Sequence, residues 1–171
     1  MALAYDQANP LQRVLRRFAA SGPGSWLFAR VLDHLDKPVY RLTRGKHTFA
    51  SLVSGLPVVM LTTTGAKSGQ RRTVPLLGLP TPRGMAVIAS NFGQARHPGW
   101  YHNLRADPHG EVAVGGTTEH FRAVEVEGEE RDRIWQQGLA VYPGWSQYEV
   151  RASHRRIPLD AAWVLEQFPP E

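Results

Sequence analysis

The spacing of hydrophobic residues along the chain changes near residue 56. Before that point, apolar residues recur every three or four positions, which is typical of helices with one buried face. After it, short apolar runs are separated by turn residues, which is typical of strands. We therefore expect an N-terminal helical segment and connector over residues 1–55, and a sheet domain over residues 56–171, within one folded unit.

The first segment is predicted to hold two helices and a connector. Residues 11–20 form a basic amphipathic helix that ends at Ser21, with Leu11, Val14, Leu15 and Phe18 on one face and Arg13, Arg16 and Arg17 toward the other. Such a helix can lie on an anionic membrane surface or pack on protein, and we favour packing. A second helix is expected over residues 25–37, followed by a polar connector over 39–54.

The sheet domain is predicted to contain five or six mostly antiparallel strands. Pro75 within one strand implies a sheet edge or a bulge. The expected strands are 56–64, 72–79, 85–90, a hairpin of 111–114 and 118–126, and a last segment over 157–165. Helices are expected over 99–106, from 129 to about 142, and as a short piece over 145–153. This order favours an α+β domain whose small sheet can close into a barrel.

Composition narrows the function classes. The formal net charge of +5 favours anionic ligands, but it is modest and no nucleic-acid recognition motif accompanies it. The chain has no cysteine, which excludes disulfides and thiolate chemistry, and its seven histidines show no metal-ligand spacing. We expect no metal site. With no signal sequence and no apolar run of spanning length, we expect a cytoplasmic protein, with contact to the inner face of the cell membrane through residues 11–20 left open.

The stretch from residue 61 to residue 76 has the composition of an anion-binding loop. Two apolar runs enclose glycines, three consecutive threonines, a serine and three cations. Glycine lets a backbone approach a ligand closely, and successive N–H groups can form an anion nest. The alternative is an exposed basic hairpin that binds nothing. The order of residues is not that of a Walker A loop.

Three further stretches combine aromatic rings with hydroxyl or amide groups near a glycine or proline bend: residues 89–93, 97–104 and 141–148. Aromatic walls bury the faces of flat ligands, while a few polar groups fix orientation. Taken singly, each stretch is better explained by core packing or helix capping than by ligand binding.

Taken together, the four stretches resemble a known family. The chain reads Leu-Thr-Thr-Thr-Gly-x-Lys-Ser-Gly-x-x-Arg at 61–72, Ala-Ser-x-x-Gly at 89–93, Pro-x-Trp-Tyr-x-Asn-Leu-x-Ala-x-Pro at 98–108 and Tyr-Pro-x-x-x-x-Tyr at 142–148. In this order they resemble the deazaflavin-dependent nitroreductase family, whose cofactor is coenzyme F-420. The resemblance spans residues 56 to 158.

The resemblance implies a split β-barrel fold, related to flavin reductases and pyridoxamine-phosphate oxidases. It implies an oxidoreductase that transfers a hydride from reduced coenzyme F-420 to a quinone-like, nitroaromatic or activated-alkene acceptor, which can be a membrane quinone. Two alternatives remain open: a split-barrel reductase that uses FMN, and a non-catalytic protein that binds a lipid or a flat cofactor. The chain is expected to be a monomer or a homodimer.

The resemblance also assigns residues. Lys67 and Arg72 match the cations that hold the cofactor phosphate. The full cofactor-binding set is Lys67, Ser68, Gly69, Arg72, Pro75, Ser90, Asn91, Trp100 and Asn103, and the substrate pocket is Tyr142, Trp145 and Tyr148. Ser90 and Tyr148 are the catalytic candidates, as donors to the acceptor oxygen. Asn91 stands where the family can have a lysine, and Trp145 where some members have a tyrosine.

Overall fold

The computed structural model describes residues 56–152 and 162–167, with a few single residues nearer the N-terminus: Val14, Phe18, Ser21, Pro38, Val39, Leu42 and Thr43. The predicted helix 25–37, nearly all of the connector 39–54 and most of the helix 11–20 lie outside the described residues. Of that first helix, Val14 and Phe18 are helical, and their side chains are exposed.

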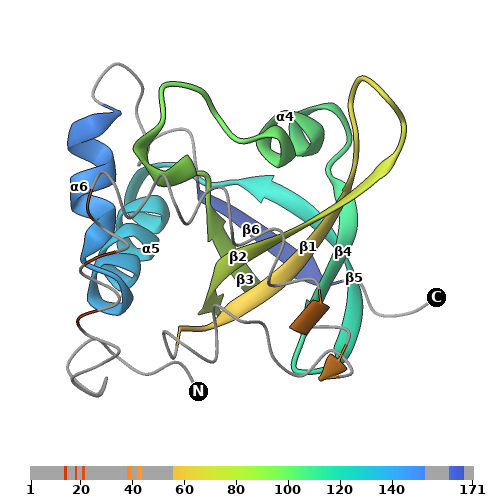
Figure 1. Ribbon diagram of the computed structural model, residues 1–171, viewed down its shortest axis with the longest axis horizontal. Coiled ribbons are helices and arrows are strands. Elements are labelled where there is room, and N and C mark those ends of the chain that lie inside the picture. Colours follow the sequence, from red (N-terminus) through yellow and green to blue (C-terminus); the bar gives the residue numbers. More distant parts are fainter. Residues whose placement is uncertain are drawn as a thin grey trace.

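Six antiparallel strands close into a barrel in the order β1-β2-β3-β6-β5-β4 (Figure 1). Their bounds are β1 Val58–Thr64, β2 Arg71–Thr81, β3 Gly84–Ile88, β4 His109–Val114, β5 Thr117–Glu125 and β6 Ala162–Gln167. The predicted split barrel of about six mostly antiparallel strands is confirmed. On β1 the alternate residues Val59, Leu61 and Thr63 are the most deeply buried, at 1%, 0% and 2% exposure, and Thr64 is exposed.

The barrel turns a corner in the middle of β2. Arg71 to Leu77 pair with β1, whereas Gly78 to Thr81 pair with β3. A side chain at Gly78 would collide with Val59 at 2.6 Å and Met85 at 2.7 Å, so glycine is needed where the three strands approach. Pro75 lies in the part of β2 that pairs only with β1, which confirms the predicted sheet edge.

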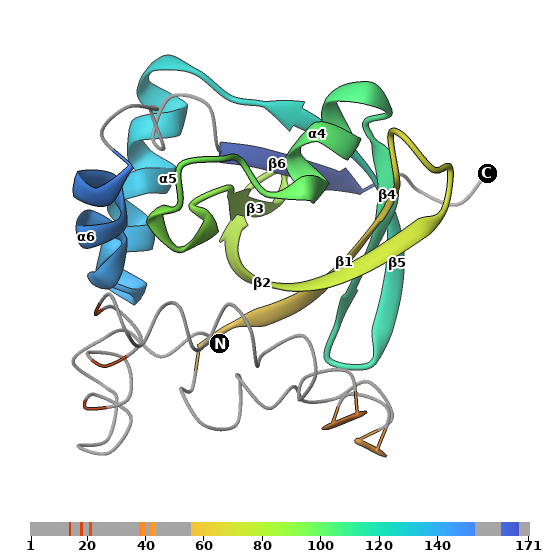
Figure 2. The ribbon, with the colours of Figure 1, turned by 45° about the horizontal axis from the view of Figure 1, so that its top comes forward.

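Helices cover one end and one side of the barrel. Helix α4, Gly99–Ala106, lies over the end that carries the β1–β2 loop, and helices α5, Gly128–Val141, and α6, Gly144–Arg151, pack together at the side (Figures 1 and 2). A single turn of 3-10 type, η2 (Asn91–Gly93), connects β3 to the loop that leads into α4. The predicted helices agree with α4, α5 and α6 to within two residues at each end.

Strand β6 is the element whose predicted bounds differ most. It pairs with β3 and β5 over Ala162–Gln167, later than the predicted 157–165, and residues 153–161 lie outside the described part. Among the described residues, no helix combines the length and the apolar character needed to span a bilayer.

Candidate functional site

Helix α4 and the β1–β2 loop (residues 65–70) are joined by one side chain. Asn103 of α4 accepts a hydrogen bond from the N–H of Ala66 through Oδ1 at 3.0 Å, and it donates from Nδ2 to the Thr63 hydroxyl at 3.0 Å. Thr63 is only 2% exposed. The side chain predicted to line a cofactor therefore also anchors the loop to the helix, across a sequence separation of 37 and 40 residues.

The backbone of the β1–β2 loop binds itself. Gly65 donates to the Gln70 carbonyl at 2.8 Å, and Ser68 and Gly69 donate to the Gly65 carbonyl at 3.2 and 2.8 Å. The N–H of Gln70 binds the Ser68 hydroxyl at 3.3 Å. Since the Ala66 N–H goes to α4, five loop N–H groups have acceptors within the protein. These donors already hold the turn, so an anion would have to compete for them; that the loop binds an anion stays a prediction.

What the loop and the first two residues of β2 offer is positive charge. The three cations differ in their partners. Arg71, on β2, forms an ion pair with Glu111, on β4, whereas Lys67 has no ion-pair partner within the described residues. Arg72 is exposed and donates to the Gln70 side chain at 2.9 Å. The guanidinium of Arg71 lowers the pKa of the Glu111 carboxyl, mainly through their hydrogen bond. Lys67 and Arg72 are therefore the loop cations left to meet an anion.

Gly69 and Pro75 lie in the β1–β2 loop and on β2, respectively. Gly69 has a φ of 66°, a conformation that other residues rarely adopt. Pro75 is half-buried on β2 opposite Met60. Trp100 is a residue of α4 whose side chain is buried in the core, at 6% exposure. The prediction that these residues contact a cofactor stays a prediction.

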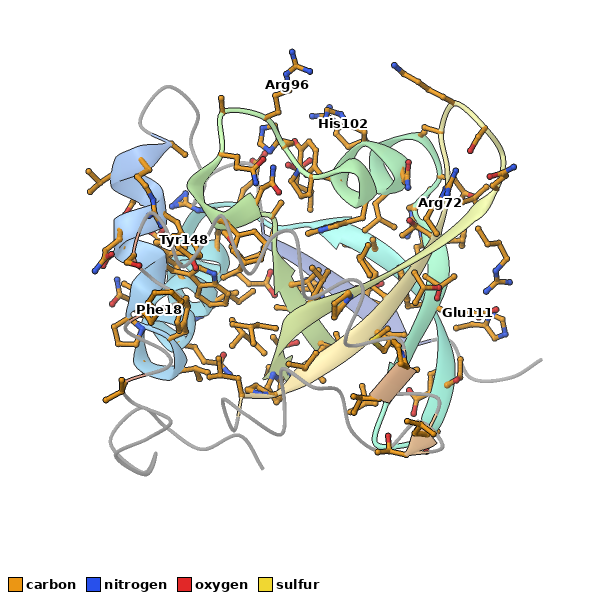
Figure 3. All side chains as sticks on the ribbon, in the orientation of Figure 1. Phe18, Arg72, Arg96, His102, Glu111 and Tyr148 are labelled. Atoms are coloured by element: carbon orange, nitrogen blue, oxygen red, sulfur yellow. The ribbon has the colours of Figure 1, made fainter. Side chains whose placement is uncertain are left out.

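A second group of predicted residues lies where β3 ends. Ser90 is buried, and the chain then enters a left-handed turn at Asn91 and Phe92, with φ of 45° and 55°. Asn91 uses its side chain locally, since Nδ2 donates to the Arg96 carbonyl at 2.7 Å. Figure 3 shows Arg96 pointing away from the barrel at the end where α4 lies. A direct contact between the Asn91 amide and a ligand would have to compete with this bond.

The hydroxyls of Tyr142 and Tyr148 are bonded to each other at 2.9 Å inside the protein. Both side chains are buried, which raises the pKa of each phenol, most strongly that of Tyr142. The guanidinium of Arg151 lies 4.8 Å from the Tyr148 ring centroid, and the centroid of the Phe92 ring lies 6.1 Å from it. Both phenols are therefore protonated at neutral pH and act as hydrogen-bond donors rather than as phenolates.

Trp145 fills the space between α5 and α6. It is 3% exposed, lies 6.2 Å from the Trp135 ring in a stacked arrangement, and meets Tyr142 edge-on at 6.1 Å. A side chain at Gly138 would sit 2.4 Å from its ring, so the missing side chain makes room for the indole. In this structure the Trp145 ring packs against the Tyr142 ring.

The structure thus brings the predicted residues together in two groups. The loop group comprises Lys67, Arg72 and Asn103, and the tyrosine group comprises Ser90 and the Tyr142–Tyr148 pair. Helix α4 and residues 91–98 connect them at one end of the barrel (Figure 2). Figure 3 places Arg72 and Tyr148 on opposite sides of that end. Among the described residues, no cluster of three metal-ligating side chains occurs.

Sequence reasoning missed four contributors to this end of the barrel: Thr63, Phe92, Arg151, and the stack of His97 on Tyr101 at 4.2 Å. A buried threonine in a row of three was a detectable signal, because alternation places the middle hydroxyl on the opposite face from its neighbours. The other three depend on contacts between distant segments.

Comparison with known proteins gives consistent matches. A family model described as "F420H(2)-dependent quinone reductase" matches residues 34–163. An F420H(2)-dependent quinone reductase of Mycobacterium tuberculosis strain H37Rv is 37% identical over 117 residues, which is 65% of this chain and 77% of that protein. A putative quinone reductase of the same description and strain is 33% identical over 87 residues, 51% of this chain and 73% of that protein.

Two solved structures share the fold. One is described as an F420-H2 dependent reductase, with a TM-score of 0.57 and 38% identity, over 64% of this chain and 94% of that one. The other is described as a domain-swapped dimer, with a TM-score of 0.60 and 34% identity, over 78% of this chain and 98% of that one.

Proposed function

The chain belongs to the F420H(2)-dependent quinone reductase family, and on that premise we propose that it reduces a quinone with reduced coenzyme F-420. Membership makes it an oxidoreductase dependent on coenzyme F-420, and the FMN alternative has no support among the relatives. The acceptor is our inference from the names of those relatives. Nitroaromatic and activated-alkene acceptors are the second candidate class.

The observation that carries the proposal is the anchored, positively charged loop. Coenzyme F-420 bears a phosphate, and the loop offers Lys67 and Arg72 as cations without a carboxylate partner among the described residues. Asn103 fixes the loop against α4, so these cations extend from a pre-formed turn. Pre-organisation lowers the entropy lost on binding, and charge-assisted bonds are about twice as strong as neutral ones. The residues present therefore fit the cofactor.

When bound, the reduced deazaflavin supplies a hydride, which carries two electrons and one hydrogen nucleus. Reduction of a quinone to a hydroquinone needs one further proton, which the protein or solvent must deliver. Lys67 and Arg72 would hold the phosphate end of the cofactor, and holding the reacting groups in one orientation would supply a large part of the rate gain.

Ser90 and the Tyr142–Tyr148 pair are the proposed donors toward the acceptor. The two phenols are hydrogen-bonded to each other at 2.9 Å, so they would act on the acceptor as one unit. The raised pKa values keep both phenols protonated, which suits hydrogen bonding to an oxygen that gains charge. Tyr148, next to Phe92 and the end of β3, is the proposed donor of the pair.

Trp145 supports a preference for quinones over nitro compounds. Its indole N–H is a donor but is not a usable acid, and its ring is enclosed by α5. It therefore does not replace the acidic hydroxyl that a tyrosine would bring. We expect quinone turnover to exceed nitroaromatic turnover by a wide margin.

A homodimer is our proposal for the assembly, supported by the neighbour described as a domain-swapped dimer. Light scattering on a size-exclusion column would give twice the chain mass of 19.1 kDa if this is right, and the single-chain mass if it is wrong. Membrane contact through residues 11–20 stays a prediction.

The test of function is an anaerobic assay with purified protein, reduced coenzyme F-420 and one acceptor at a time. Menadione should restore the visible absorbance of the oxidised cofactor, and a nitrofuran and cyclohexenone should do so far more slowly. Equal turnover of all three would refute the quinone preference. Binding of the cofactor with no turnover of any acceptor would favour the non-catalytic alternative.

A further inference from the structure

Arg151, the last residue of α6, lies beside the tyrosine pair. It follows Tyr148 by three positions, which places both side chains on the same face of the helix. The central carbon of its guanidinium lies 4.8 Å from the centroid of the Tyr148 ring. A guanidinium is flat and weakly hydrated, so it stacks on aromatic faces in a way that the compact ammonium group of lysine does not. The contact therefore depends on arginine and not on positive charge alone.

The stem of the Arg151 side chain lies against the turn that follows β3. Helix α6 and η2 are side by side in both views of the ribbon (Figures 1 and 2). A methyl group added to Gly93 would lie 3.1 Å from the Arg151 Cβ and 3.0 Å from the Tyr148 Cα, so helix and turn are in close contact at this glycine. Arg151 thus packs on the turn through its stem and on the tyrosine ring through its head.

Arg151 is the charged group that acts on the Tyr148 phenol among the described residues. The turn η2 carries no ionisable side chain, Tyr142 reaches the phenol from the end of α5, and Glu149 on α6 is exposed. Burial raises the pKa of the Tyr148 phenol, whereas the hydrogen bond with Tyr142 and the charge of Arg151 lower it. The guanidinium therefore makes the buried hydroxyl a better proton donor than burial alone would allow.

We propose that Arg151 is a positioning residue for the reaction: its guanidinium holds the Tyr148 ring and supplies positive charge beside the phenol that donates to the acceptor. The inference rests on the proposed function, because Tyr148 is a donor only if an acceptor binds next to it. Arg151 acts through Tyr148 in this role and touches neither the acceptor nor the cofactor. It lies outside the residues that the sequence resemblance assigned.

The proton balance explains why a cation is useful here. The hydride brings two electrons and one hydrogen nucleus to the quinone, and one oxygen then carries negative charge. A proton leaves the Tyr148 oxygen for that oxygen, so the phenol O–H bond breaks and an O–H bond of the hydroquinone forms. The phenolate bears its charge beside the guanidinium until solvent returns a proton. A fixed opposite charge stabilises such an anion most where water is excluded.

Two substitutions separate the charge of Arg151 from its shape. Arg151→Met removes the charge and keeps an unbranched stem against Gly93. Arg151→Lys keeps the charge and loses the flat group that stacks on the ring. The matched control is Arg133→Met, which removes an exposed cation from α5, where it pairs with Glu129 at 3.9 Å. The Tm of each variant shows that it is folded.

The first measurement uses the protein without cofactor or acceptor. Difluorotyrosine incorporated at position 148 ionises at lower pH than tyrosine, in a range where the protein stays folded, and fluorine NMR follows its ionisation. We expect Arg151→Met to move the titration midpoint to higher pH, because the phenolate loses its cation. Arg151→Lys should move it less, and Arg133→Met should not move it. A purely structural role for Arg151 would leave the midpoint unchanged.

The second measurement is turnover of menadione with reduced coenzyme F-420. Arg151→Met should lower kcat by about tenfold, because a positioned acid contributes about 10²–10⁴-fold and this variant keeps the acid but weakens its support. The KM of menadione and the Kd of coenzyme F-420 should stay within about threefold of the parent, since Arg151 touches neither ligand. Arg151→Lys should recover part of the lost kcat, and Arg133→Met should match the parent.

A double-mutant cycle tests whether Arg151 acts through Tyr148. In a Tyr148→Phe background, Arg151→Met should lower kcat by no more than about twofold further, because the group that it supports is gone. An equal loss in both backgrounds overturns the proposal. So does a folded Arg151→Met variant whose titration midpoint matches the parent, whatever its kcat. If the parent does not turn over menadione, the proposed function fails, and the titration midpoint alone then decides whether Arg151 acts on the phenol.

Discussion

Replacement of Asn103 by alanine should weaken cofactor binding through the loop. The side chain makes two bonds: one to the buried hydroxyl of Thr63 and one to the exposed N–H of Ala66. Leaving a buried polar group unsatisfied costs about 1–3 kcal/mol, and an ordinary hydrogen bond contributes about 0.5–1.5 kcal/mol. Asn103→Ala should therefore lower the free energy of unfolding by about 2–3 kcal/mol, which corresponds to roughly 5–10 °C in Tm.

The effect on affinity follows from the freed loop. Fixing one backbone residue costs about 1–2 kcal/mol, and about 1.4 kcal/mol corresponds to a tenfold change in Kd. If release of Ala66 leaves one residue to be ordered on binding, the Kd of coenzyme F-420 should rise about tenfold. Fluorescence titration of the oxidised cofactor measures the Kd, and differential scanning calorimetry measures Tm.

Two matched variants make the reasoning refutable. Thr63→Val removes only the buried bond, so it should lower Tm while leaving the Kd within twofold. A backbone ester at Ala66 removes only the loop bond, so it should reproduce the loss of affinity with little change in Tm. If Asn103→Ala weakens binding and the Ala66 ester does not, Asn103 acts by touching the cofactor itself. If Asn103→Ala leaves the Kd unchanged, the loop does not position the phosphate.

Three other predictions concern the cations Lys67 and Arg72, the glycine at position 138 and the phenol of Tyr148. The double variant Lys67→Ala with Arg72→Ala should raise the Kd of coenzyme F-420 at least tenfold and leave Tm nearly unchanged, because both side chains are exposed and their contacts to a phosphate would be charge-assisted. Gly138→Ala should lower the free energy of unfolding by about 1–3 kcal/mol in urea melts, since the added methyl would meet the Trp145 ring at 2.4 Å. Burial raises the pKa of the Tyr148 phenol above its ordinary value of 10.0, so the folded state holds that proton more tightly than the unfolded chain. Stability should therefore fall as pH rises above 10.0, and Tyr148→Phe should flatten that fall.

Each of these predictions has a control in the chain. Arg122→Ala with Arg133→Ala removes two exposed cations far from the loop in sequence, and it should leave the Kd unchanged; an equal loss would mean that net charge alone attracts the cofactor. Gly99→Ala adds a methyl with no atom within 4 Å, and it should leave stability within about 0.5 kcal/mol. An alkaline stability curve that Tyr148→Phe does not alter would contradict the buried-phenol argument.

Local sequence patterns were sufficient to predict most of the barrel. The alternation in β1, the Gly115-Gly116 turn between β4 and β5, and Pro75 at a one-sided stretch of β2 all act over a few residues, so the sequence displays them directly. Helices α4 and α5 begin near Pro98 and Gly128, where proline and acidic residues mark helix starts.

The site was only partly predictable, because its geometry depends on contacts between distant segments. Composition showed that the β1–β2 loop is small and basic, but not that its N–H groups are used within the turn and by Asn103. Asparagine tolerates a positive φ, but no local signal marks Phe92 as left-handed, and the turn also depends on the bond from the Asn91 side chain to the Arg96 carbonyl. The resemblance placed Trp145 in a substrate pocket, and the space that Gly138 leaves for it could not be deduced from either residue alone.

The central claim is that this chain oxidises reduced coenzyme F-420 with a quinone. Single-turnover mixing of the protein, loaded with reduced cofactor, against menadione in an oxygen-free stopped-flow instrument tests it most directly. The account predicts one oxidised cofactor and one hydroquinone per site, formed much faster than without protein and slowed when Lys67 and Arg72 are both alanine at subsaturating cofactor. A loaded protein whose cofactor is oxidised no faster than the free cofactor would contradict it.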